Sequence, residues 1–138
     1  MILLGIDYGT KRIGLAITDE LEIIASPLKT IPNDPNSIDE IRKIATERGV
    51  QLVVVGMPLN MDGSLGPAGK AVQKFAEKLR AEMAAPVETF DERLTTAQAE
   101  RSMLMHDLSR AKRAGRRDEM AAQIMLQSCI DARKRMKR

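Results

Sequence analysis

The chain has few aromatic side chains: its 138 residues include one Tyr, two Phe and no Trp. Stacking of bases on aromatic rings therefore cannot be its main way of recognising a nucleic acid. It also has a single cysteine, Cys129, and a single histidine, His106. One cysteine excludes an internal disulfide, and too few nitrogen and sulfur ligands are present for a zinc site. Any bound metal ion is therefore expected to have oxygen ligands.

Long apolar runs are also missing, since no stretch approaches the roughly 18 apolar residues of a membrane span. The first residues lack the basic flank and the cleavage site of a signal peptide. Together with the single cysteine, these absences predict a cytoplasmic protein that does not associate with membranes. With 43% hydrophobic residues, the chain suits one globular domain over residues 1–138.

The net charge of +3 is unevenly distributed along the chain. Residues 101–138 hold 11 of the 22 Lys and Arg residues but only 4 of the 19 Asp and Glu residues. The cations are dense at 110–117, which includes Arg113, Arg116 and Arg117, and in a basic tail at about 133–138. Such a cluster predicts a surface for a polyanion, because cations release counterions from a phosphate backbone. A solvated helix face with a frayed tail is an equally good interpretation.

Hydrophobic patterning predicts a mixed α/β fold. Two apolar runs joined by a short turn predict two strands, and a third run contains Pro27, which indicates a bulge or an edge position. After these, strands alternate with helices, which requires crossover connections and parallel pairing. We therefore expect a five-stranded sheet, a meander of three strands followed by parallel βαβ units, flanked by helices and with the first strand in the middle. The expected strands are 2–7, 12–18, 21–31, 51–56 and 86–94, and the expected helices are 38–49 (capped by Ser37), 68–84, 95–108 and 118–135.

Acidic residues stand at the ends of three expected elements. Asp7 ends the first strand, Asp91 and Glu92 end the last strand, and Asp118 opens the last helix. Taken singly, Asp118 could be a helix N-cap, and Asp91 or Glu92 could pair with Arg93. Asp7 is harder to explain in this way, because a carboxylate at the end of a buried strand needs a partner, a proton or a metal ion.

Together, these carboxylates suit a metal centre. Closely packed carboxylates repel one another unless a divalent cation neutralises them. Oxygen ligands without His or Cys select Mg²⁺ or Mn²⁺, and such ions can activate water and stabilise a leaving oxygen at a phosphodiester. Beside a basic helix, the expected substrate is nucleic acid.

Four motifs, in this order, resemble those of the YqgF/RuvX family of bacteria: "GIDYGTKRIGLAI", "VVVGMPLNMDGS", "FDERLTT" and "RRDEMAAQIMLQ". The resemblance covers nearly the whole chain. It implies a ribonuclease H-like fold and a metal-dependent phosphodiesterase acting on structured nucleic acid. Members are described as Holliday junction resolvases and as nucleases that mature the 5′ end of 16S ribosomal RNA.

The resemblance also implies roles for individual residues. Asp7 would be the central metal ligand and Asp118 the ligand on the last helix. Within "DER" the longer Glu92 is favoured over Asp91, because a strand alternates its faces and only one of the two can easily point with Asp7. Better-known resolvases of this fold carry a glutamate at the end of the strand equivalent to 51–56, where this chain has Gly56. The metal site would therefore be completed from "DER".

Two loops are candidate substrate contacts. The first contains Gly9, Thr10, Lys11 and Arg12, and the second contains Asn60 and Gly63, with Arg93 as a further cation. Glycine lets a backbone approach phosphates closely, and the cations add charge. Ordinary turn chemistry is an equally good explanation: a positive φ at Gly9 and a tight turn at Asp62-Gly63.

Three functions remain open at this stage. The favoured one is a nuclease that acts on pre-rRNA within ribosomal precursor particles, as a monomer. The second is a resolvase that acts on branched DNA, which would favour a homodimer because symmetric cuts need two sites. The third is a module that binds nucleic acid without cleaving it. An actin-like ATPase is excluded, because its second domain does not fit in 138 residues.

Overall fold

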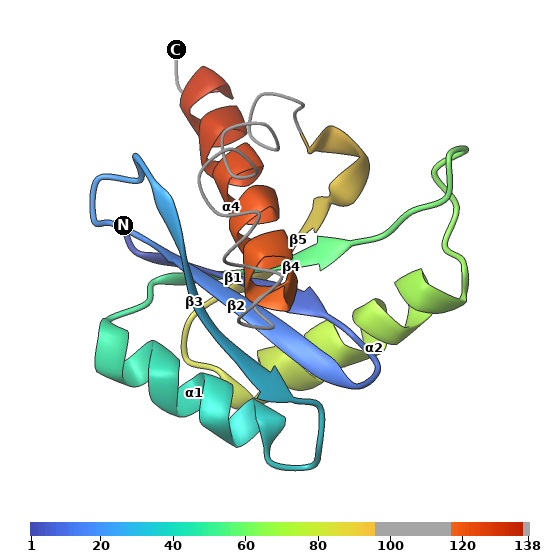
Figure 1. The fold of residues 1–138 in the computed structure, drawn as a ribbon, viewed down its shortest axis with the longest axis horizontal. Coiled ribbons are helices and arrows are strands. Elements are labelled where there is room, and N and C mark those ends of the chain that lie inside the picture. The colour runs from blue at the N-terminus through green and yellow to red at the C-terminus, as the bar shows by residue number, and fades with distance from the viewer. Residues whose placement is uncertain (96–116, 137–138) are drawn as a thin grey trace.

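A computed structural model describes residues 1–95 and 117–136 of the chain (Figure 1). Five strands, a 3₁₀ helix and three α-helices make up this part. The strands are β1 (Leu3–Tyr8), β2 (Arg12–Thr18), β3 (Ala25–Pro32), β4 (Leu52–Met57) and β5 (Val87–Asp91). The helices are α1 (Ser37–Arg48), α2 (Pro67–Glu82), the 3₁₀ helix Glu92–Leu94 and α4 (Arg117–Met136). None of these helices is long and apolar enough to span a membrane.

The strands form one mixed sheet in the order β3-β2-β1-β4-β5. The pairs β1–β2 and β2–β3 are antiparallel, and the pairs β1–β4 and β4–β5 are parallel. The prediction of a three-stranded meander followed by parallel βαβ units, with the first strand in the middle, is confirmed. Strands β1, β4 and β5 therefore end at the same edge of the sheet.

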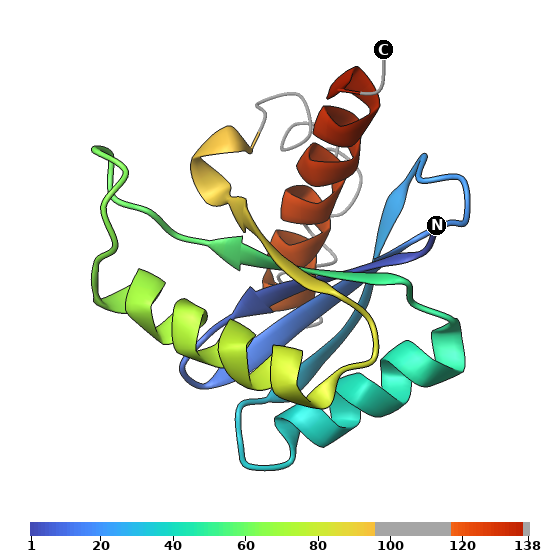
Figure 2. The same cartoon turned by 180° about the vertical axis from the view of Figure 1, so that it is seen from behind.

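The sheet lies between two helical layers, α1 and α2 on one face and α4 on the other (Figures 1 and 2). Side chains alternate along β1, so Leu4 and Ile6 belong to the core under α1 and α2. Leu3 belongs to the core under α4, with Leu126 and Ile130 of that helix. By the same alternation, Asp7 lies on the α4 side of the sheet.

Two glycines let α4 lie very close to the sheet. A Cβ atom at Gly5 would lie 2.9 Å from the Cβ of Leu126. A Cβ atom at Gly14 would collide with the backbone carbonyl of Asp118. Gly14 is also the β2 partner of Asp7. The first turn of α4 is therefore brought directly beside the end of β1.

The third strand is shorter than predicted, because it begins at Ala25 and not at residue 21. Asp19 accepts hydrogen bonds from the backbone N–H groups of Ile23 and Ile24, and these bonds hold the preceding residues in a turn. The interpretation of Pro27 is confirmed: β3 is an edge strand, and its pairing with β2 shifts register beside this proline.

The last strand is also shorter than predicted. It ends at Asp91, whose side chain accepts a hydrogen bond from the backbone N–H of Arg93 and so begins the 3₁₀ helix. Ser37 is not the N-cap of α1. Its hydroxyl donates to the carbonyl of Pro32 and accepts from the N–H of Asp34. The helix predicted at 95–108 falls almost wholly outside the described residues.

Candidate active site

Asp7 lies near the end of the central strand, half-buried between its neighbours in the sheet. β1 pairs with β2 on one side and with β4 on the other, so its backbone is fixed on both sides. The first turn of α4 covers the same spot through the close contact at Gly14. The carboxylate is thus held by rigid elements, as a catalytic group or metal ligand requires.

Glu92 reaches the same place from the end of β5. A Cβ atom at Gly56 would lie 2.5 Å from Oε1 of Glu92. The Glu92 carboxylate therefore fills the space that a side chain at the end of β4 would occupy. Position 56 thus needs no acidic side chain for a carboxylate to reach this place, because the 3₁₀ helix that follows β5 supplies one.

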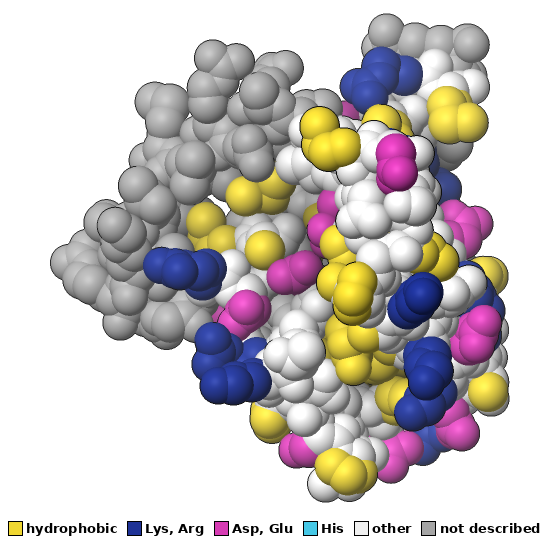
Figure 3. All heavy atoms as spheres, turned by 90° about the vertical axis from the view of Figure 1, so that its right-hand side faces the viewer, with side chains coloured by type: hydrophobic (Ala, Val, Ile, Leu, Met, Phe, Trp, Pro, Cys, Tyr) yellow, Lys and Arg dark blue, Asp and Glu magenta, His cyan; other side chains and the backbone are white. Residues whose placement is uncertain are grey.

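Asp7 and Glu92 line one hollow of about 300 Å³ together with Thr95 and with Ile124 and Met125 of α4. Figure 3 views the molecule from the side towards which β1 and β4 point. Acidic side chains lie beside a hollow near the centre of this view, with hydrophobic side chains next to them and basic side chains further out. The hollow combines an acidic pair with apolar walls that limit its hydration.

The carboxyl groups of Asp7 and Glu92 are both partly buried, and both have raised pKa values. Burial raises the pKa of Asp7, and the nearby charge of Asp118 raises it further. Burial also raises the pKa of Glu92, with additional contributions from the charges of Asp7 and Asp91. A pair that burial and mutual repulsion both disfavour in the charged form is suited to a divalent cation, which removes the repulsion.

Asp118 stands nearby but is engaged by another residue. Its Oδ2 accepts from Nε of Arg12 at 2.9 Å in a partly exposed ion pair. Within residues 1–95 and 117–136, no three His, Cys, Asp or Glu side chains are grouped so as to hold a metal ion. The structure thus brings Asp7 and Glu92 together, whereas the nearby Asp118 is paired with Arg12. Two carboxylates without His or Cys are a donor set that would suit a magnesium-type ion.

Asp91 is directed into different contacts. It forms an ion pair with Arg93, with 2.7 Å between Oδ2 and Nη2, and this pairing lowers the pKa of Asp91. Arg93 also donates from Nη1 to the carbonyl of Met61 at 3.2 Å. The 3₁₀ helix that carries Glu92 is therefore tied to the loop between β4 and α2. The alternative role of Asp91 in pairing with Arg93 is the one seen in the structure.

The loop between β1 and β2 has the exposed residues Thr10 and Lys11, and the exposed Arg12 follows as the first residue of β2. It is anchored by Asn33, whose side-chain amide donates to the carbonyl of Gly9 and whose backbone N–H donates to the carbonyl of Lys11. Gly9 does not have a positive φ, so that prediction is wrong. Glycine is needed there because a Cβ atom would lie 2.5 Å from the carbonyl oxygen of Arg12.

The second loop is a compact turn. Asn60 donates from its side chain to the hydroxyl of Ser64, and the carboxylate of Asp62 accepts from the same hydroxyl and from the backbone N–H of Ser64. Gly63 has a φ of 88°, so the prediction of a tight turn is confirmed. Met61 lies at the tip and is 94% exposed. Because its polar groups bond to one another, this loop has a preformed shape.

Of the three predicted arginine contacts in the basic segment, Arg113 and Arg116 lie outside the described residues, and Arg117 is the exposed first residue of α4. The sequence did not identify Thr95, Ile124 and Met125, which line the hollow, or Gly14, which admits Asp118. It marked Gly56 only as a position without a carboxylate, whereas this glycine admits Glu92. For the glycines the available signal was their place inside apolar strands, where a glycine often marks a close approach.

Asp7→Asn is expected to melt, without metal ions, at the same temperature as the wild type or up to about 5 °C higher. The reason is that the substitution removes a charge that burial and Asp118 disfavour. Thermal unfolding in EDTA, followed by circular dichroism, measures this. A clear drop would identify Asp7 as a structural hydrogen-bonding residue instead.

The same comparison has a pH dependence. A folded state with raised carboxyl pKa values binds more protons than the unfolded chain, so these groups favour folding more as pH falls from neutrality towards 4.5, the ordinary value for Glu92. The wild type should therefore gain stability relative to Asp7→Asn over this range. Melting curves of both proteins in EDTA at several pH values test the sign.

Gly56→Ala is expected to slow phosphodiester cleavage, the activity expected from the sequence, by about tenfold or more. The stability of the protein should be unchanged or slightly higher. The new methyl group displaces only the flexible end of Glu92, and alanine within a strand is favoured over glycine. Cleavage rates and urea unfolding separate the two effects. In a double-mutant cycle, Gly56→Ala should add little to Glu92→Gln, because both act on the same carboxylate. Additive losses would contradict this account.

The chain matches known proteins over nearly its whole length. Residues 1–132 match the family model described as "RuvX: Holliday junction resolvase". A protein of Geobacillus kaustophilus named "Putative pre-16S rRNA nuclease" is 46% identical over 135 residues, covering 95% of this chain and 98% of the relative. A protein of the same name from Endomicrobium trichonymphae is 47% identical over 133 residues, 94% of each chain.

Solved structures support the fold. RuvC of T. thermophilus in complex with a Holliday junction substrate superposes with a TM-score of 0.63 at 15% identity, over 97% of this chain and 96% of that chain. The Fowlpox virus resolvase in complex with Holliday junction DNA superposes with a TM-score of 0.57 at 13% identity, over 96% of this chain and 98% of that chain. The ribonuclease H-like fold expected from the sequence is confirmed. The family match and the identities to its relatives show that the chain belongs to the RuvX family of nucleases.

Proposed function

We propose that the protein is a metal-dependent endonuclease that hydrolyses phosphodiester bonds in structured RNA, and that it processes the 5′ end of pre-16S rRNA in the cytoplasm. The observation that carries this proposal is the desolvated Asp7–Glu92 pair at the edge of the sheet where β1, β4 and β5 end. The names of the relatives support the choice of RNA, and their identities of 46% and 47% extend over nearly the whole chain.

Asp7 and Glu92 are the residues that would hold Mg²⁺ or Mn²⁺. When bound, the ion supplies an activated water and charge stabilisation at the phosphate. Arg12 holds Asp118 in place through the ion pair, so the first turn of α4 stays fixed against β2. Arg93 fixes the loop that carries Asn60 and Met61 relative to Glu92. The chain thus contributes a rigid frame on which a phosphate backbone can be aligned.

A resolvase acting on four-way DNA junctions is the second candidate, because the family model carries that description. Symmetric cleavage of a junction needs a two-fold dimer with two sites. Trimming of one RNA end needs a single site, which fits a monomer. The oligomeric state in solution should therefore be measured alongside each activity, because it distinguishes the two candidates.

The test is cleavage of two labelled substrates, a pre-16S RNA fragment with its 5′ extension and a four-way DNA junction, with Mg²⁺, with Mn²⁺ or with EDTA. We expect metal-dependent shortening of the RNA and no symmetric cuts in the junction. Cells depleted of the protein should accumulate 16S rRNA with an unprocessed 5′ end. Normal rRNA ends together with junction cleavage by a dimer would transfer the assignment to a resolvase. Binding without cleavage in any metal would leave only a nucleic-acid-binding module.

A further inference from the structure

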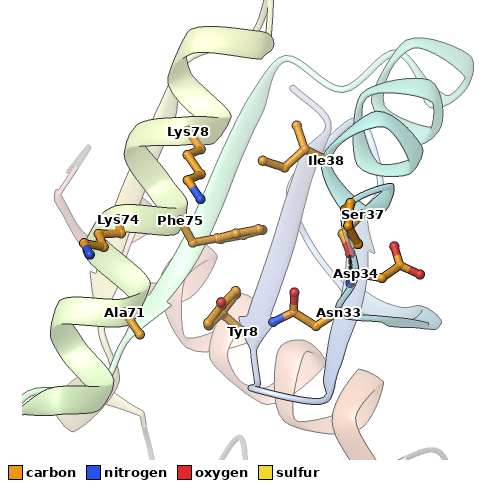
Figure 4. A pocket seen from close by; sticks show the side chains of 10 residues that line it. Tyr8, Asn33, Asp34, Ser37, Ile38, Ala71, Lys74, Phe75 and Lys78 are labelled. Carbon is orange, nitrogen blue, oxygen red and sulfur yellow. Dashed lines mark hydrogen bonds between the residues drawn. The ribbon is translucent and has the colours of Figure 1, made fainter.

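A second pocket lies on the opposite face of the sheet from the carboxylates. It has a volume of about 410 Å³ and lies between the end of β1, the loop that leads into α1, and one face of α2 (Figure 4). Its walls combine an aromatic pair, Tyr8 and Phe75, with the polar Asn33 and with two cations, Lys74 and Lys78. Its volume is in the range of small-molecule sites. Asn33 anchors the loop at Gly9, and the other residues named here have no role described above.

The aromatic pair gives the pocket a flat apolar surface. The ring centroids of Tyr8 and Phe75 lie 4.5 Å apart, with the ring planes tilted by 38°. Phe75 is buried in the core, with 6% of its surface exposed, whereas Tyr8 is only partly buried. Figure 4 shows both rings at the pocket, with the Asn33 side chain next to Tyr8. The structure therefore gathers two of the three aromatic residues of the chain at one place.

The charge of the pocket favours an anion. Lys74 and Lys78 lie one turn apart on α2, and neither forms an ion pair with the described residues. Lys70, one turn earlier, continues the same row of cations. Asp34 is the single acidic residue of the lining, and its Oδ1 already accepts from the backbone N–H of Asn36. Unpaired ammonium groups beside an aromatic surface suit a ligand that has both a phosphate and a planar ring.

The position of the pocket connects it with the active site. Tyr8 directly follows Asp7 in β1, so their Cα atoms are about 3.8 Å apart and their side chains point to opposite faces. Beyond them the chain turns at Gly9. A nucleic acid strand that crosses this edge of the sheet can present one phosphate to Asp7 and a neighbouring nucleotide to Tyr8.

We propose that this pocket binds one unpaired nucleotide of the substrate strand, with its base on the Tyr8–Phe75 surface and its phosphates at Lys74 and Lys78. This inference rests on the proposed nuclease function, since it assigns the pocket to the same strand. It gives the protein a means of selecting a single-stranded segment next to the bond that is cut. The chemistry of the ligand is that of a nucleoside monophosphate unit, which is present in a strand and in a free nucleotide.

The single tyrosine makes the pocket directly observable. In protein labelled with 3-fluorotyrosine, the ¹⁹F NMR spectrum has one protein signal, from position 8. We expect this signal to shift when a single-stranded RNA hexanucleotide is added in EDTA, where no cleavage occurs. A blunt RNA duplex and uridine 5′-monophosphate serve as the comparison ligands, and both should shift the signal far less at equal nucleotide concentration.

Two substitutions test the residues. Lys74→Gln/Lys78→Gln should weaken hexanucleotide binding and reduce the slope of log K against log salt by about 1.4, because each contact with a single strand contributes about 0.7. The matched control, Lys43→Gln/Arg48→Gln, removes the same charge from α1 outside the pocket and should leave the slope within about 0.3 of wild type. Tyr8→Leu should weaken binding by about tenfold, and Tyr8→Phe should restore it.

Three results would overturn the proposal. The first is strand binding that leaves the ¹⁹F signal unchanged, and the second is an equal loss of slope in the control variant. The third is binding of the free nucleotide as tight as that of the strand, which would make the pocket a mononucleotide site. All of these measurements are made without metal ions. A failure here therefore differs from a failure of the nuclease assignment, which would show as absent cleavage despite intact binding.

Discussion

Asp7→Asn and Glu92→Gln are each expected to lower the rate of RNA cleavage by at least about a hundredfold, a loss of about 2.7 kcal/mol in transition-state stabilisation. Both side chains line the hollow at the edge of the sheet, and both are carboxylates whose burial disfavours the ionised form. Their amide counterparts keep the shape but remove the negative charge that a divalent cation requires. Single-turnover rates at saturating Mg²⁺ measure the effect.

Asp91→Asn is the matched control, because it makes the same change one residue before Glu92. Asp91 forms an ion pair with Arg93 and does not line the hollow, so the rate of RNA cleavage should fall by no more than about fivefold. Binding of uncleaved RNA in EDTA should be unaffected in Asp7→Asn and Glu92→Gln. If Asp91→Asn lost as much activity as Glu92→Gln, the metal ligand would have to be reassigned within the "DER" motif.

Gly14→Ala is expected to produce the largest loss of stability, about 3 kcal/mol or more, with a fall in melting temperature of about 10 °C or more. The new methyl group would collide with the backbone at Asp118 and Glu119, and a helix backbone cannot rotate away as a side chain can. The first turn of α4 must therefore move off β2, and the ion pair between Arg12 and Asp118 must change with it. Urea unfolding gives the free energy.

Gly49→Ala provides the comparison for this effect. Gly49 ends α1 with a φ of 67°, and a Cβ atom there has no neighbour within 4 Å. Its substitution costs only the backbone strain of a left-handed residue, about 1–2 kcal/mol. Gly14→Ala should exceed that cost and also reduce activity, whereas Gly49→Ala should leave activity unchanged. Equal losses of stability in the two variants would show that α4 can move away from β2 at little cost, which would contradict this account.

Local patterns in the sequence predict most of the sheet. The apolar run before Asp7 and the β-branched run 51–56 both form strands, and their pairing follows from the rule that parallel strands need crossovers. The predicted ends of the strands were less accurate where a side chain forms hydrogen bonds with backbone groups that would otherwise pair within the sheet. Asp19 does so before β3, and Asp91 does so at the end of β5.

The site was only partly predictable, for a physical reason. Asp7 could be identified because an apolar strand that ends in a carboxylate is costly without a function. The pairing of Arg12 with Asp118 joins residues 106 positions apart, and no local pattern indicates it. The space above Gly56 is likewise a tertiary feature: its glycine is visible in the sequence, but the carboxylate that fills it comes from the 3₁₀ helix after β5.

The candidate active site joins segments that are far apart along the chain, since Asp7 belongs to β1 and its neighbour Asp118 to α4. The order of protein synthesis therefore bears on when the site can form. A nascent chain still held within the ribosome at its last helix has β1 but lacks the layer that covers it. Until α4 is released and packs against Gly5 and Gly14, the carboxylate of Asp7 remains open to water. The candidate site is therefore complete only after α4 has been synthesised and has packed against β1 and β2.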